Sequence, residues 1–121
     1  MSAFSDVDSL RPQAIWAGVT TRAVHGERMT VGLIELEPGS TVPEHAHDNE
    51  QVGMLITGSL DFRVGAETRQ LEPGGIWCIP SRVPHTVSAG PKGAVLVEAF
   101  SPPRDDWRAL EAGEPGRGRW P

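Results

Sequence analysis

Glycine and proline interrupt this 121-residue chain at short intervals. The sequence has 14 glycines and 11 prolines, which are spread along its whole length and not gathered in one segment. Between them lie short runs rich in aliphatic residues, bounded by turns such as Glu37-Pro38-Gly39-Ser40 and Glu72-Pro73-Gly74-Gly75. Short strands with a turn roughly every ten residues are typical of β-sandwiches and barrels. The sequence therefore predicts an all-β fold.

The length allows one domain with a modest core. We expect an N-terminal arm over residues 1–12, a barrel domain over residues 13–103, and a short helix with a tail over residues 104–121. The single cysteine, Cys78, excludes an intrachain disulfide, and its apolar neighbours predict that it is buried as a small hydrophobic residue.

Charge and hydropathy exclude several classes of partner. Lysine and arginine number 11 against 16 aspartates and glutamates, a net charge of −5, and no basic cluster is present to meet a nucleic-acid backbone. The longest apolar runs, such as residues 94–97, are far shorter than the roughly 20 residues of a membrane-spanning helix. The first residues are acidic and unlike a secretory signal. We therefore expect a cytoplasmic protein that binds neither nucleic acid nor membrane.

Two histidines in the stretch from Pro43 to Gln51 are the strongest chemical signal. His45 and His47 are separated by one residue, so both imidazoles project to the same side of an extended strand. Gln51 follows in the same odd register, and its carbonyl oxygen offers a third ligand for one metal ion. The neighbouring Glu50 points the other way, but a bulge in the strand would let its carboxylate replace Gln51.

The spacing of this stretch resembles a known family. It runs Gly39, His45, His47, Gln51, Gly58, and a second stretch runs Gly74, Pro80, His85. Together they resemble the two signature motifs of the cupin superfamily over about residues 30–100, with glutamine where that family has glutamate. The resemblance implies a double-stranded β-helix, or jelly-roll barrel, in which His45, His47, Gln51 and His85 face inward around one divalent transition metal ion. It also implies a homodimer.

The identity of the ion stays open. Imidazole suits Zn, Ni, Mn, Fe or Cu in a nitrogen and oxygen shell. A neutral amide in place of a carboxylate leaves the ion its full charge, which strengthens it as a Lewis acid. The alternative, in which the histidines only pack or form hydrogen bonds inside a barrel, also remains.

The segment from Val97 to Trp107 is similar to the closing segment of small cupins of pectin and alginate breakdown. Those proteins convert 4,5-unsaturated uronates into linear keto sugars, and the similarity implies catalytic roles for Glu98, Phe100 and Arg104. Glu98 stands where that family has aspartate. Independently, Glu98 and Phe100 share one face of a strand, so an inward Phe100 brings Glu98 inward too. A carboxylate there is a candidate proton shuttle, and Arg104 a candidate anchor for a substrate carboxylate.

The leading hypothesis is thus a metal-dependent enzyme for small, anionic sugar acids. Three alternatives use the same barrel: a non-haem metal dioxygenase, a non-catalytic protein that binds a small ligand, and a polyketide-type cyclase.

Overall fold

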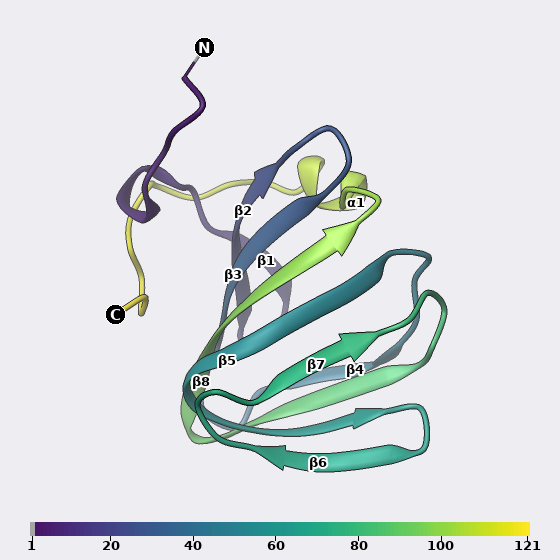
Figure 1. Ribbon diagram of the computed structural model, residues 1–121. Helices are drawn as coiled ribbons and strands as arrows, with labels where there is room; N and C mark the ends of the chain where they lie inside the picture. The colour runs from purple at the N-terminus through teal and green to yellow at the C-terminus, as the bar shows by residue number, and fades with distance from the viewer. Residues whose placement is uncertain (1) are drawn as a thin grey trace.

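The computed structural model describes residues 2–121 and is built almost wholly from antiparallel strands (Figure 1). Its elements are η1 (Val7–Ser9), β1 (Gln13–Trp16), β2 (Val19–His25), β3 (Thr30–Leu36), β4 (Thr41–His45), β5 (Glu50–Val64), β6 (Glu67–Leu71), β7 (Ile76–Ile79), β8 (His85–Ser101) and the one-turn helix α1 (Asp105–Arg108). The prediction of an all-β fold is confirmed.

Two long strands, β5 and β8, divide the barrel into two sheets. The first half of β5 and the second half of β8 lie in a sheet of order β1-β2-β3-β8-β5-β7. Their other halves lie in a sheet of order β4-β8-β5-β6. Each long strand thus passes from one sheet into the other, which gives the predicted jelly roll.

A tight corner lets both long strands bend at the same place. Gly58 has a φ of 87°, and a Cβ atom added to it would lie 2.0 Å from the carbonyl oxygen of Gly93. Only glycine allows the two backbones to approach so closely. The positions that face inward also change at this corner. In each long strand, odd-numbered residues such as Gln51 and His85 are buried on the N-terminal side of the corner, and even-numbered residues such as Phe62 are buried on its C-terminal side.

The space between the sheets is filled by side chains from their inner faces. Phe62 and Trp77 meet with ring centroids 5.0 Å apart, and Leu36, Leu55 and Ile79 are almost fully buried. Removal of this apolar area from water is the main force that holds the two sheets together.

The N-terminal arm and the C-terminal tail pack against each other. The side-chain amide of Gln13 donates to the carbonyl oxygens of Trp107 and Leu110, at 2.8 and 2.9 Å. Arg117 forms an ion pair with Asp8 at 3.0 Å. The two bonds of Gln13 hold β1 against α1 and the residues that follow it, and the ion pair joins the arm to the tail.

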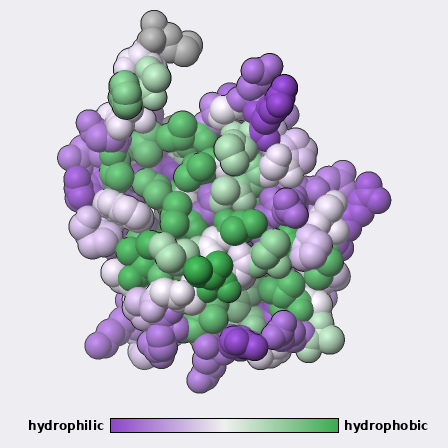
Figure 2. Space-filling view, viewed as in Figure 1, coloured by the Kyte–Doolittle hydropathy of each residue, from purple (hydrophilic) through white to green (hydrophobic). Residues whose placement is uncertain are grey.

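The outer face of the larger sheet carries an apolar patch, which we define as Val31, Val52, Met54, Ile76 and Val97. The first four are exposed, and paired strands β3, β8, β5 and β7 place all five side by side. Figure 2 shows hydrophobic residues gathered on this face.

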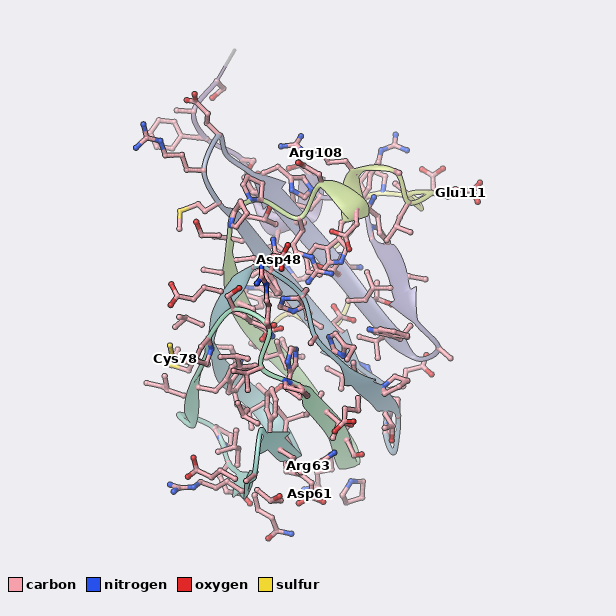
Figure 3. All side chains as sticks on the ribbon, turned by 90° about the vertical axis from the view of Figure 1, so that its right-hand side faces the viewer. Asp48, Asp61, Arg63, Cys78, Arg108 and Glu111 are labelled. Atoms are coloured by element: carbon pink, nitrogen blue, oxygen red, sulfur yellow. The ribbon has the colours of Figure 1, made fainter. Side chains whose placement is uncertain are left out.

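The prediction that Cys78 is buried is wrong. Its side chain is exposed and points away from the barrel (Figure 3). Trp77 and Ile79 take the inward positions of β7, so the residue between them faces outward.

No helix among residues 2–121 has the length and apolar character needed to cross a membrane.

Candidate metal centre

Three histidines lie close together at the C-terminal end of β4. His45 ends β4 and is paired with His85, which begins β8, while His47 lies in the loop that leads to β5. Their ligand nitrogens all lie within 4.8 Å of one another. Gln51, in β5, brings its side-chain oxygen to 3.0 Å from Nε2 of His47. The structure therefore brings together all four residues that the sequence singles out as ligands.

Each histidine uses the same nitrogen to hold its ring in place. The Nδ1 atoms of His45, His47 and His85 lie 2.8, 3.0 and 2.9 Å from the carbonyl oxygens of Pro43, Asn49 and Val83. A carbonyl oxygen only accepts, so Nδ1 carries the proton and donates in every case. The Nε2 atom of each ring is then a bare acceptor, which is the form that binds a metal.

Two observations show that these acceptor atoms have neither a hydrogen-bond donor nor a cation beside them within residues 2–121. Nε2 of His85 is buried and makes no hydrogen bond among the described residues. Nε2 of His47 and the oxygen of Gln51 face each other at 3.0 Å, although both carry lone pairs and neither carries a proton. A buried acceptor without a partner is costly. One cation between the four groups satisfies all of them, so the residues fit a divalent metal ion.

Burial keeps His47 and His85 in the neutral form that binds a metal. Removal from water lowers the pKa of His85 to about 4, and it lowers the pKa of His47 as well. In both residues the backbone hydrogen bond opposes this effect only in part. Both rings are therefore uncharged at neutral pH.

The geometry favours Gln51 over Glu50 as the fourth ligand. Gln51 is 5% exposed and faces the histidines, whereas Glu50 is exposed on the opposite side of β5. The strand alternates regularly here, without the bulge that would turn Glu50 inward.

Glu98 lies beside this cluster with its carboxyl group buried. Its Oε2 atom accepts hydrogen bonds from the amide nitrogen of Gln51 and, at 2.7 Å, from the indole nitrogen of Trp77. Burial raises the pKa of Glu98, and these two bonds and the charge of Arg104 oppose that effect only in part. A raised pKa holds the proton on the carboxyl group more firmly, which suits a residue that donates and recovers protons.

The hydrogen bond between Trp77 and Glu98 is a feature of this site that the sequence did not reveal. Trp77, Gly53 and Glu98 are neighbours across β7, β5 and β8. Gly53 has no side chain, so the indole crosses it to reach Glu98; a Cβ atom there would lie 2.6 Å from the ring. Only the strand register brings these three residues together, and no local sequence signal marks it.

Arg104 is held by three neighbours at the far side of the cavity. Its Nε and Nη2 atoms donate to the two carboxylate oxygens of Asp106 at 3.0 and 2.9 Å. Its guanidinium carbon lies 4.9 Å from the ring centroid of Phe100 and 4.4 Å from that of Trp107. This arrangement leaves Nη1 for a ligand, and it makes Phe100 a support for Arg104.

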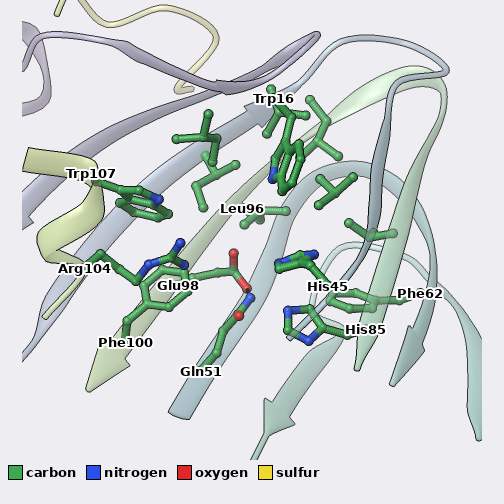
Figure 4. Close-up of a pocket in the computed structure, with 16 residues that line it drawn as sticks. Trp16, His45, Gln51, Phe62, His85, Leu96, Glu98, Phe100, Arg104 and Trp107 are labelled. Carbon is green, nitrogen blue, oxygen red and sulfur yellow. Dashed lines mark hydrogen bonds between the residues drawn. The ribbon is translucent and has the colours of Figure 1, made fainter. Parts of the chain in front are cut away.

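Five of these polar residues line one cavity (Figure 4). His45, Gln51, His85, Glu98 and Arg104 line its polar side. Its other walls are aliphatic and aromatic, and Trp16 stands over His45 with ring centroids 5.5 Å apart. The cavity thus presents imidazole nitrogens, an amide oxygen, a carboxyl group and a guanidinium to one small space.

The amino-acid sequence is similar to that of one protein family and of two individual proteins. The cupin domain family matches residues 32–100. The pectin degradation protein KdgF of Dickeya dadantii is 28% identical over 75 residues, which cover 61% of this chain and 68% of that protein. An uncharacterised protein of Streptomyces coelicolor is 28% identical over 86 residues, or 71% of this chain and 82% of that protein.

Solved structures share the fold. An RmlC-like cupin from Shewanella frigidimarina superposes with a TM-score of 0.81 at 24% identity, covering 88% of this chain and 96% of that one. KdgF from a Halomonas species superposes with a TM-score of 0.80 at 22% identity, covering 88% and 98%.

Proposed function

The chain belongs to the cupin family, and we propose that it is a metal-dependent enzyme that converts 4,5-unsaturated uronates, or closely related sugar acids, into linear keto forms. The observation that carries the proposal is the cavity itself, where the unpartnered Nε2 of His85, the buried carboxyl group of Glu98 and the guanidinium of Arg104 face one space. The similarity to a pectin degradation protein supports the same class of substrate.

The metal ion belongs to this proposal. His45, His47, Gln51 and His85 would hold one divalent ion, with Zn, Ni, Mn, Fe and Cu as candidates. When bound, such an ion supplies Lewis-acid stabilisation for substrate oxygens.

Arg104 and Glu98 supply the remaining functions. The guanidinium of Arg104 binds the substrate carboxylate through Nη1, while Asp106 keeps the group in place. Conversion of a cyclic unsaturated uronate into its keto form opens the ring and moves a proton from oxygen to carbon, with no other reactant. Glu98 can move that proton through Oε1, because Oε2 is already occupied by two N–H donors.

We also propose that the chain forms a homodimer through the apolar patch on the outer face of the larger sheet. Ile76, at 69% exposure, and its neighbours on adjacent strands form a continuous surface of aliphatic side chains. Such surfaces usually mark an interface.

The test is an assay of metal-loaded protein with an unsaturated uronate, followed by loss of the ultraviolet absorbance of the carbon–carbon double bond. Loss of absorbance that requires both metal and Arg104 is the expected result. Oxygen uptake by the iron-loaded protein would instead indicate a dioxygenase. Saturable binding without any product would indicate a ligand-binding protein. Ring closure of an aromatic polyketide precursor would indicate a cyclase.

A further inference from the structure

The side-chain amide of Gln51 has two ends of opposite character. Its oxygen binds a cation, and its nitrogen, which carries two protons, does not. A free glutamine side chain can present either end to the histidines. If Gln51 is a ligand, as the proposed function requires, a neighbouring residue must select the oxygen end.

Glu98 determines which end of the Gln51 amide faces the histidines. The Oε2 atom of Glu98 accepts from the amide nitrogen of Gln51, so that nitrogen turns toward Glu98. The amide oxygen then faces the histidines, 3.0 Å from Nε2 of His47. Gln51 and Glu98 are 5% and 7% exposed, which leaves little competition from solvent for this bond.

Trp77 in turn fixes Glu98. Its indole nitrogen donates to the same Oε2 atom at 2.7 Å, and it is 7% exposed. Without this second donor the carboxyl group would be free to turn toward the positive charge of Arg104. Gly53 makes the contact possible, because any side chain at that position would displace the indole.

We propose that Trp77 is a positioning residue for the metal centre: through Glu98 it fixes the Gln51 amide with its oxygen toward the three histidines. Trp77 is not among the residues that line the cavity, and it acts through a chain of two hydrogen bonds. Groups that orient a ligand in this way typically change metal affinity by about 10- to 100-fold.

The experiment measures zinc affinity of the purified chain by competition with a chromogenic chelator. Glu98→Leu removes the shared acceptor and is expected to weaken zinc binding about 10- to 100-fold. Trp77→Phe, which replaces the indole by a smaller aromatic ring without an N–H donor, is expected to weaken zinc binding as well. Glu98→Gln keeps a side-chain oxygen that can accept both bonds, so its affinity is expected to stay close to that of the wild type.

Two controls separate this effect from general damage. Trp120→Phe makes the same change in a tryptophan of the C-terminal tail and is expected to leave zinc affinity unchanged. Thermal unfolding of each metal-free variant reports loss of core packing, and the further rise in Tm on addition of zinc reports the site alone. If Trp77→Phe does not fold, the Glu98→Leu and Glu98→Gln pair still tests the chain of bonds.

The outcomes distinguish this inference from the proposed function. If the wild type binds zinc and both Trp77→Phe and Glu98→Leu bind it equally well, the positioning role is overturned while the metal centre stands. If Glu98→Gln loses as much affinity as Glu98→Leu, charge and not the acceptor oxygen is responsible, and the role is again overturned. If the wild type binds no metal, the proposed function and this inference both fall.

Discussion

His45 and His85 face each other directly across the ladder between β4 and β8, with ring centroids 4.3 Å apart. The pair joins the two motifs of the sequence into one site, because β8 returns beside β4 after the intervening strands have built the rest of the barrel. His47 completes the group from the following loop.

Removal of one imidazole is expected to abolish metal binding. Protein purified without a metal-affinity tag should contain about one divalent ion per chain, and His85→Ala should lose it during purification, because the two remaining imidazoles and a neutral amide oxygen hold a divalent ion much more weakly. Elemental analysis measures both. His25→Ala changes a histidine that contacts Thr30 outside the cluster and should keep its metal. A metal-free wild type would contradict the prediction.

Glu98→Gln is expected to lower turnover at least about 100-fold, because an amide cannot transfer the proton that a carboxyl group does. Metal content should stay at the wild-type level. Steady-state kinetics with an unsaturated uronate, together with elemental analysis of the same sample, checks both parts. An active Glu98→Gln protein would end the assignment of Glu98 as the proton shuttle.

Arg104→Lys is expected to raise KM for a carboxylate substrate about 10-fold or more, because the lysine ammonium cannot reproduce the planar pairing with both Asp106 and the substrate. Kinetics with the substrate and with its methyl ester measures the effect: the wild type should discriminate strongly and the variant weakly. Arg69→Lys, at an exposed position on β6, is the matched control and should behave like the wild type.

Acid is expected to destabilise the metal-free protein through His85. Its pKa is about 4 in the folded chain, against 6.5 for an exposed histidine. As the pH falls through this range, the unfolded chain binds the proton first, so the free energy of unfolding decreases from about pH 6.5 to about pH 4, by roughly 3 kcal/mol at most. Denaturant unfolding at several pH values checks this. A His85→Gln protein should show a shallower decline, and an equal decline would contradict the assignment.

The apolar patch is expected to hold two chains together. Sedimentation should give a species of twice the 13.0 kDa chain mass, and Ile76→Glu should shift it to the single chain, since a charge buried in an apolar interface is strongly unfavourable. Gln70→Glu, which adds the same charge on exposed β6, should leave the dimer intact. A wild type that sediments only as a single chain would contradict the homodimer.

The part of the site that depends on local alternation could be predicted from the sequence. The inward direction of Gln51 and the shared face of Glu98 and Phe100 both follow from the period of a strand, and the structure has both. The barrel itself was indicated by the spacing of turns and by the paired motifs.

The rest depends on contacts that no local pattern contains. Trp77 reaches Glu98 only because β5 and its Gly53 lie between them, and the sequence does not state which strands are neighbours. The outward Cys78 has the same origin: in a run as short and apolar as β7, composition alone does not decide which residues face inward.

The corner that β5 and β8 share also limits how this barrel can vary in length. β8 enters it with His85 inward and leaves it with Glu98 inward, although the two residues differ in parity. One residue gained or lost between them would turn one of these side chains out of the cavity. The same change in the hairpin at Gly65 would leave both in place. Insertions and deletions compatible with the site are therefore confined to the turns. The segment of β8 between His85 and Glu98 must keep its present number of residues.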